Sequence, residues 1–222
     1  MLFVNLFSFV AFFGAIDYTV REVICLDDKK YRKLFSDLPI IQTERLILRK
    51  IMPEDLYDMY EYASDDEVSR FLMWSPHLNI AETRGHIEYL QKQYRKGCAT
   101  DWGVALKSSN KLIGTCGFAS VDLHNNKAEI GYVLSQKYRK RGYMREAVNK
   151  ILEIGFLRLG LNRIEARILE SNAQSEGLAE SVGMKKEGTL RKALFIKGVY
   201  KTFSYYAITK DEYIGATDLH NA

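Results

Sequence analysis

The chain has few cysteines, few prolines and no histidine pattern that would suit a metal. Its three cysteines are odd in number and widely spaced, and its four histidines lack the short spacings of zinc motifs. We therefore expect neither a disulfide framework nor a metal site. Three prolines in 222 residues are too few for a disordered linker, and no internal repeat or low-complexity tract is present.

The chain also lacks a large excess of either positive or negative charge. The chain has 32 Lys and Arg residues against 28 Asp and Glu residues, a formal net charge of +4, which does not demand a nucleic-acid partner, and DNA is not expected as one. Two phosphate-binding motifs are missing: the Gly-x-Gly-x-x-Gly of dinucleotide folds and the Gly-Lys-Ser/Thr of nucleoside-triphosphate loops. The cysteine pattern favours a reducing cytosol, so we expect a cytoplasmic protein.

One apolar run stands near the N-terminus. Residues 2–16 are apolar except for Asn5, Ser8 and Gly14, but a membrane span needs about 20 residues. The first Arg is Arg21, so the basic segment of a signal peptide is absent. We expect no stable membrane span, and secretion is disfavoured. Three interpretations of the apolar run stay open: a membrane-surface anchor, an element packed on the domain or on a partner, and upstream sequence included by a misplaced start codon.

Hydrophobic periodicity predicts one mixed α/β domain. The predicted order is a strand at 45–49, helices from Pro53 and Asn79, three antiparallel strands at 102–106, 112–121 and 128–134, a helix ending near Gly160, a strand at 164–168, a helix ending near Gly183, and a strand pair at 189–209. The helix from Pro53 is expected to bury Leu56, Met59, Tyr60 and Ala63. This order predicts one central, mostly antiparallel mixed sheet flanked by helices. We place an extension at 1–40, the domain at 41–213 and a tail at 214–222.

An apolar strand, a basic turn and an amphipathic helix follow one another directly. The strand ends at Leu134, the turn contains Arg139-Lys140-Arg141-Gly142, and the helix repeats apolar residues from Val148 to Leu159. Gly142 permits a tight entry into the first helical turn, whose unpaired N–H groups then suit an anion. Lys137 and Arg145 add positive charge at the same helix end. A solvated basic face is the alternative interpretation.

This segment resembles the acetyl-coenzyme A loop of the GNAT superfamily of N-acetyltransferases, which reads Gln/Arg-x-x-Gly-x-Gly/Ala at the start of a helix. Arg139 and Gly142 match the first two fixed positions, and Met144 departs from the third, where a small residue is usual. Lys140 stands where close relatives often have another glycine. The resemblance therefore implies acetyl-coenzyme A (acetyl-CoA) as the acetyl donor.

The resemblance extends over residues 41–213 and is strongest to the branch that acetylates the N-termini of ribosomal proteins. The segment Ile41 to Arg49 is similar to the first strand of that branch. Asn172-Ala173-Gln174-Ser175, then Val182-Gly183-Met184 and Glu187-Gly188, are similar to its later motifs in order and spacing. The acceptor implied is a primary amine, most closely a protein N-terminus. The resemblance allows a homodimer.

The resemblance also assigns roles to particular positions. The backbone of Tyr132, Val133 and Leu134 is expected to pair with the pantetheine arm and to supply the oxyanion donor, while the side chains pack in the core. Cofactor contacts are expected from Tyr132, Val133, Leu134, Arg139, Lys140, Arg141, Gly142, Tyr143, Met144, Arg145 and Asn172. Ser175 matches a serine that protonates the departing thiolate. Helix capping is the alternative role for Asn172 and Ser175.

Glu129 is the candidate general base, acting directly or through a water, because it lies on the strand that borders the acetyl group. It could instead be an exposed cross-strand partner. An amine at a chain terminus has a pKa near neutrality, so it needs only a weak base. Trp74, Trp102, Tyr200 and Tyr205 could line an acceptor groove, although core packing is the favoured role for most of them.

We expect an N-acetyltransferase. Two alternatives stay open: an enzyme that acetylates a small amine such as an aminoglycoside, a polyamine or an amino acid, and a non-catalytic module that senses acetyl-CoA or contacts RNA through its basic loop.

Overall fold

The structure is a computed structural model that describes residues 29–98 and 100–221. Its elements, in chain order, are α1 (Lys29–Ser36), β1 (Ile41–Gln42), β2 (Leu46–Arg49), η2 (Pro53–Asp55), α2 (Leu56–Ala63), α3 (Asp66–Ser69), α4 (Ile80–Lys96), β3 (Asp101–Leu106), β4 (Leu112–Asp122), β5 (Lys127–Leu134), η3 (Gln136–Tyr138), α5 (Tyr143–Glu153), η4 (Ile154–Leu159), β6 (Arg163–Leu169), α6 (Ala173–Ser181), β7 (Lys185–Ile196), β8 (Val199–Thr209) and α7 (Lys210–Asn221).

Eight strands form one sheet in the order β1-β2-β3-β4-β5-β6-β8-β7. Every neighbouring pair is antiparallel except β5 and β6, which run parallel. This arrangement confirms the predicted mixed, mostly antiparallel sheet and the three consecutive antiparallel strands that lead into the basic turn. Because β5 and β6 are parallel, the chain between them must cross over, and α5 makes that connection.

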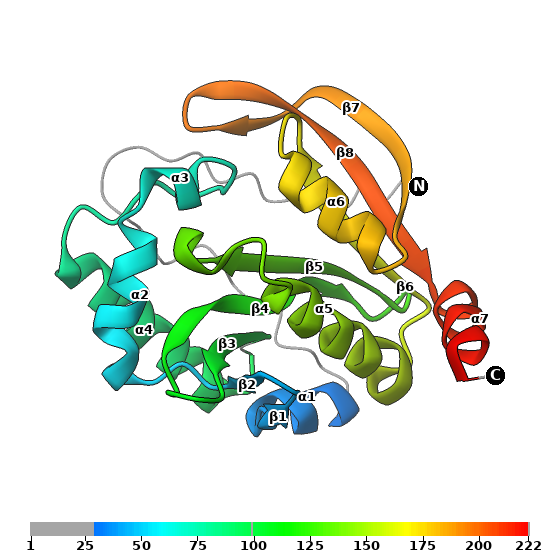
Figure 1. Cartoon of the computed structure of the whole chain (residues 1–222), viewed down its shortest axis with the longest axis horizontal. Coiled ribbons are helices and arrows are strands. Elements are labelled where there is room, and N and C mark those ends of the chain that lie inside the picture. The colour runs from blue at the N-terminus through cyan, green and yellow to red at the C-terminus, as the bar shows by residue number, and fades with distance from the viewer. Residues whose placement is uncertain (1–28, 99, 222) are drawn as a thin grey trace, which may run out of the picture.

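Helices cover the sheet and enclose its core. In Figure 1, α5 and α6 lie on the near side of the sheet, and α4 passes behind β3 and β4. The predicted stripe faces inward, since its residues Val148, Ile151 and Leu152 on α5 are almost fully buried. Gly160 ends the following π-helical turn in the left-handed conformation (φ 74°), as the sequence predicts. In α2 the buried residues include Tyr62 rather than the predicted Tyr60.

The first described helix contributes to the same core. Tyr31, Phe35 and Leu38 are buried, and the Phe35 ring meets the Trp102 ring edge-on with centroids 6.2 Å apart. The core therefore begins before residue 41, where we had predicted the domain to start. The apolar run at 2–16 lies outside the described residues.

Helix α7 occupies much of the predicted C-terminal tail. It is capped by two reciprocal hydrogen bonds: the Thr209 N–H donates to Glu212 Oε2 (2.9 Å), and the Glu212 N–H donates to Thr209 Oγ1 (3.4 Å). This is a Thr-x-x-Glu capping box, a signal present in the sequence. Strand β7 also begins at Lys185, earlier than the predicted residue 189.

Two sequence expectations concern cysteine and membrane association. Cys116 is free and buried, and Cys25 lies outside the described residues. Among the helices of the described part of the chain, none combines the length and apolar character needed to cross a membrane.

Candidate active site

Strands β5 and β6 diverge, and we refer to their diverging ends, residues 130–134 of β5 and 166–169 of β6, as the β5–β6 cleft. The two strands pair at only three positions, where Lys127 to Glu129 face Arg163 to Glu165, and Figure 1 shows them separating beyond this point. On its other edge β5 stays paired with β4 as far as Leu134, which lies opposite Gly114. One edge of the β5 backbone from Ile130 to Leu134 therefore has no strand partner, and its N–H and C=O groups face the cleft.

The residues predicted to border this cleft do lie on the free part of β5. Tyr132, Val133 and Leu134 are half-buried and pack against the core. Strand alternation places Tyr132 on the face that carries α6, and its Oη lies 3.5 Å from the Ser175 carbonyl oxygen. Burial raises the pKa of Tyr132 to about 12, so the phenol stays protonated at neutral pH.

The basic turn forms an open helix N-terminus at one end of the cleft. Lys140 (φ 61°) and Gly142 (φ 79°) both adopt the left-handed conformation. Glycine adopts this conformation most easily, which accounts for the glycines that the resembling sequences have at these two positions. Gly142 is the N-cap of α5 and offers no side-chain hydrogen bond to the first turn. The N–H groups of Tyr143, Met144 and Arg145 are therefore available to an anion.

Only part of the positive charge in this turn is free. Lys137 pairs with Glu61 (Nζ to Oε1, 2.6 Å), and the same carboxylate binds Lys111. Hydrogen bonds from Lys111 and then Lys137 lower the pKa of Glu61. The Arg139 Nη2 donates to the Glu67 carbonyl oxygen at 3.3 Å, which leaves its charge uncompensated.

Three further cations of the turn have no ion pair within the described part of the chain, and all are exposed: Lys140, Arg141 and Arg145. Together with Arg139 they make the α5 N-terminus electropositive. The Met144 side chain is 6% exposed and packs in the core, so only its backbone can meet a ligand. The set of backbone N–H groups and cations suits a diphosphate.

Glu146 fixes this helix end to the first strands. Its carboxylate accepts hydrogen bonds from the Thr43 hydroxyl, the Arg45 N–H (2.8 Å) and the Arg45 Nε (2.7 Å). Arg45 in turn donates to the Arg141 carbonyl oxygen (2.9 Å) and lies 4.7 Å from the centre of the Tyr143 ring. Sequence reasoning did not identify this contact, because nothing in the sequence links positions about 100 residues apart.

Glu146→Gln is expected to lower the free energy of unfolding by about 1–2 kcal/mol at neutral pH, a value that allows for solvent screening at Arg45. Burial raises the pKa of Glu146, but the hydrogen bonds from Thr43 and Arg45 outweigh it, so the net pKa is lowered. A depressed carboxyl pKa stabilises the fold above the unfolded value, about 4.3, and this contribution is lost as the pH falls through the folded value. Urea unfolding of both proteins from pH 7 to pH 3 measures the difference.

The matched control for that measurement is Glu153→Gln on the same helix. Glu153 pairs with Lys150 at 2.6 Å, and both side chains are 37% exposed, so its loss is expected to change stability by less than about 0.5 kcal/mol. A destabilisation by Glu146→Gln that stays constant down to pH 3 would contradict the assignment.

The N-terminus of α6 supplies the remaining candidates. The Asn172 Oδ1 accepts a hydrogen bond from the Ser175 N–H (3.3 Å), so Asn172 caps the helix as one of its two interpretations predicts. The Ser175 side chain is half-buried and lies within hydrogen-bonding reach of the Tyr132 phenol. The Tyr132 hydroxyl lies beside Ser175, so two neutral O–H groups lie together where α6 begins.

Glu129 takes part in an ion pair. Its two carboxylate oxygens meet the Arg167 guanidinium, with Nε to Oε1 at 2.8 Å and Nη2 to Oε2 at 2.7 Å. The hydrogen bond and the attraction of Glu129 raise the pKa of Arg167 against the opposing effect of burial. This geometry agrees with the cross-strand interpretation of Glu129, and both of its carboxylate oxygens contact the guanidinium.

The four aromatic residues considered for an acceptor groove are dispersed. Trp102 is fully buried and donates from Nε1 to the Pro39 carbonyl oxygen at 2.9 Å. Trp74 is half-buried beside His77, Tyr205 packs edge-on against Phe203, and Tyr200 is exposed. They do not line one common groove.

Comparisons with known proteins agree with this geometry. The family model described as an acetyltransferase (GNAT) domain matches residues 45–185. An uncharacterized N-acetyltransferase, p20, of Bacillus licheniformis is 36% identical over 175 residues, 79% of this chain and 98% of that protein. The [ribosomal protein uS5]-alanine N-acetyltransferase of Escherichia coli is 24% identical, over 80% of this chain and 95% of its own.

A solved structure gives the same result for the fold. The GNAT-family acetyltransferase of Bacillus anthracis superposes with a TM-score of 0.70 at 29% identity, and the match covers 78% of this chain and 99% of that one. GNAT acetyltransferases use acetyl-CoA as the acetyl donor. This chain is an N-acetyltransferase that belongs to the GNAT family.

Proposed function

We propose that the protein transfers the acetyl group of acetyl-CoA to the α-amino group of a protein N-terminus, such as that of a ribosomal protein. The observation that carries this proposal is the Glu129–Arg167 ion pair, because the guanidinium engages both oxygens of the strand's carboxylate and leaves the amine without a free carboxylate on β5. An α-amino group has a pKa of about 7.7–8.0 and is about half neutral near that pH, whereas a lysine at about 10.4 is almost entirely protonated there.

The relatives support the same acceptor class. The E. coli relative acts, by its name, on an alanine of ribosomal protein uS5, and another relative from Bacillus subtilis is named as a putative ribosomal N-acetyltransferase. A polyamine acceptor would call for free carboxylates, but Glu129 is paired with Arg167, and Glu61 with Lys111 and Lys137. Both observations favour a terminal amine over a polycation.

In the proposed reaction, the amine nitrogen forms a bond to the acetyl carbon and the carbon–sulfur bond breaks. A backbone N–H of β5 between Ile130 and Leu134 stabilises the oxyanion on the carbonyl oxygen. The amine gives up one proton to solvent, the thiolate takes one from the Ser175 hydroxyl at the α6 N-terminus, and solvent returns a proton to the Ser175 oxygen. The first turn of α5, with Arg139, Lys140, Arg141 and Arg145, holds the diphosphate of the donor, and Asn172 contacts the pantetheine.

The test is release of free thiol from acetyl-CoA in the presence of different amines. We expect release with peptides that begin with Ala or Ser, and little with spermidine, an aminoglycoside or the same peptides blocked at the N-terminus. Release with a small amine alone would replace the protein acceptor. Saturable acetyl-CoA binding in calorimetry without release from any amine would instead indicate a sensor.

Arg139→Ala is expected to weaken acetyl-CoA binding about tenfold at low salt, because a charge-assisted contact to a phosphate is lost. The difference from the unmodified protein should shrink as salt rises, since the lost attraction is screened. Calorimetric titration at two salt concentrations measures both effects. Arg158→Ala, an exposed cation in the last turn after α5, is the control; an equal loss in both variants would contradict the role of Arg139.

A further inference from the structure

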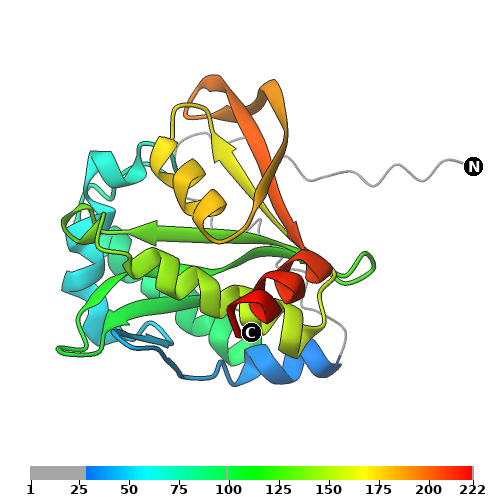
Figure 2. The same ribbon diagram turned by 45° about the vertical axis from the view of Figure 1, so that its right-hand side comes forward.

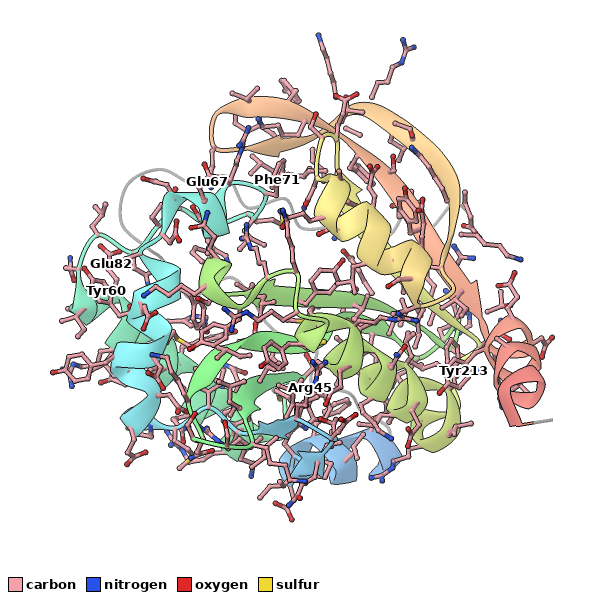
Figure 3. The ribbon with its side chains drawn as sticks, in the orientation of Figure 1. Arg45, Tyr60, Glu67, Phe71, Glu82 and Tyr213 are labelled. Carbon is pink, nitrogen blue, oxygen red and sulfur yellow. The ribbon has the colours of Figure 1, made fainter. Side chains whose placement is uncertain are left out.

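The side chain of Arg45 reaches from the start of β2 to the turn before α5, at the end of this helix that points away from α7 (Figure 2). Figure 3 shows Arg45 between α5 and the first strands. Its Nε donates to Glu146 Oε2 at 2.7 Å, and its Nη1 donates to the Arg141 carbonyl oxygen at 2.9 Å. The guanidinium also lies over the Tyr143 ring. One planar group therefore binds a side chain of α5 and the backbone immediately before that helix.

The bond to the Arg141 carbonyl fixes how the peptide between Arg141 and Gly142 is oriented. In a trans peptide the C=O and the N–H point in opposite directions, so the Gly142 N–H points away from Arg45. Because glycine has no Cβ, the guanidinium can come close: an added Cβ on Gly142 would lie 3.3 Å from Arg45 Nη2. The carbonyl oxygen, which would repel an anion at this turn, is thereby held on a cation.

Glu146 would by itself oppose an anion at the same place. It lies in the first turn of α5, where its negative charge favours the helix dipole but repels a diphosphate. The Thr43 hydroxyl, the Arg45 N–H and the Arg45 Nε all donate to its carboxylate, and the guanidinium compensates its charge. The pair is neutral as a whole, and four cations of the turn stay available to the donor: Arg139, Lys140, Arg141 and Arg145.

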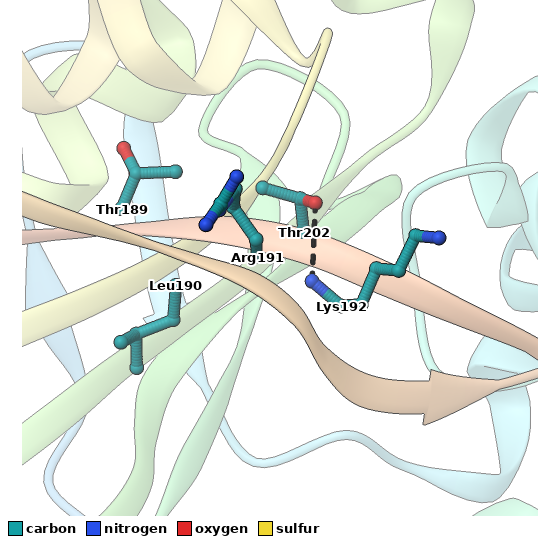
Figure 4. Close-up of a pocket in the computed structure, with 5 residues that line it drawn as sticks. All are labelled: Thr189, Leu190, Arg191, Lys192 and Thr202. Atoms are coloured by element: carbon teal, nitrogen blue, oxygen red, sulfur yellow. Dashed lines mark hydrogen bonds between the residues drawn. The ribbon is translucent and has the colours of Figure 1, made fainter.

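A second cationic hollow, on the β7–β8 hairpin, shows what the turn beside Arg45 adds. The hollow is lined by Thr189, Leu190, Arg191, Lys192 and Thr202 (Figure 4), all of them strand residues. There the Lys192 N–H already donates to Thr202 Oγ1 at 3.2 Å. The hollow therefore offers side-chain cations without an open helix N-terminus, whereas the turn before α5 offers both.

We propose that Arg45 is a positioning residue for the diphosphate of acetyl-CoA, and that it acts through the Arg141–Gly142 peptide and the Glu146 carboxylate. The guanidinium suits this role because its rigid, planar group donates in two fixed directions at once, which a lysine ammonium on a flexible stem does not. The inference rests on the use of acetyl-CoA by the GNAT family and is independent of the acceptor proposed above.

The test compares two donors in calorimetric titrations, which need no acceptor. Arg45→Gln is expected to bind acetyl-CoA about tenfold more weakly, and Arg45→Lys about fivefold more weakly, because the charge alone does not hold the peptide. S-acetylpantetheine has the thioester and the pantetheine arm but no diphosphate. Its affinity, measured by displacement of acetyl-CoA, is expected to change less than about twofold in both variants, since it does not reach the turn.

The matched control is Arg49→Lys at the other end of β2. Arg49 also binds a carboxylate with two nitrogens, that of Asp55, and contacts Asn110, but neither partner belongs to the turn before α5. This variant is expected to lower the melting temperature and to keep its acetyl-CoA affinity within about twofold.

Four results would overturn the proposal: unchanged acetyl-CoA affinity in Arg45→Gln, equal losses for acetyl-CoA and S-acetylpantetheine, full affinity in Arg45→Lys, or an equal loss in Arg49→Lys. The second would mean a general loosening of the cleft, and the third would mean that the charge of Arg45 acts alone.

Discussion

Gly114→Ala is expected to be among the most damaging single changes in this protein. A Cβ at this position would lie 2.1 Å from the Val133 carbonyl oxygen and 3.1 Å from the Leu134 Cα. These are backbone atoms of the paired strand, so no side chain can rotate away and β4 and β5 must separate. We expect the free energy of unfolding to fall by about 3 kcal/mol, a large part of the 5–15 kcal/mol typical of a domain.

The same substitution should also weaken acetyl-CoA binding, because Val133 and Leu134 form the free edge of the cleft. Urea unfolding measures the first effect, and calorimetric titration under strongly native conditions measures the second. Gly177→Ala in α6 is the control, since no atom lies within 4 Å of its added Cβ and alanine favours a helix interior by about 0.5–1 kcal/mol. Unchanged stability and affinity in Gly114→Ala would contradict the role assigned to this strand pair.

The parts of the fold that follow from local patterns were predicted well. The inward stripe of α5 depends on residues three and four apart, and the turn at Gly142 depends on the conformational freedom of one residue. The capping box at Thr209 and Glu212 is equally local, so the helix that replaces much of the predicted tail could have been identified from its sequence.

The parts that depend on distant contacts could not be predicted. The Glu129–Arg167 ion pair requires knowing how β5 lies beside β6, and the carboxylate of Glu146 reaches Thr43 and Arg45 across the sheet. The cleft itself exists because the β5–β6 pairing stops after Glu129. No residue type marks that point, since the strand sequence continues without interruption to Leu134.

Ser175→Ala is expected to lower kcat about 100-fold, the lower end of the range for a general acid, while the affinity for acetyl-CoA changes less than about threefold. The side chain of Ser175 interacts with the Tyr132 phenol, and the Ser175 N–H has its cap from Asn172. Removing the hydroxyl therefore leaves the helix start intact, and the loss should appear in kcat rather than in binding. Steady-state kinetics with the amine identified by thiol release, together with calorimetry, separate the two.

The Tyr132 hydroxyl is a second group positioned for this role, because it lies 3.5 Å from the Ser175 carbonyl oxygen and its pKa is raised to about 12. Tyr132→Phe keeps the buried ring and removes only the O–H. If that variant loses kcat and Ser175→Ala does not, the proton comes from the phenol; if both lose it and the double variant loses no more, the two hydroxyls act as one relay. Ser181→Ala is the control within α6, because its hydroxyl donates to the Leu178 carbonyl oxygen at the far end of the helix. A kcat that survives all of these changes would mean that the cleft accelerates transfer by positioning and by its backbone N–H groups alone, with solvent supplying the proton.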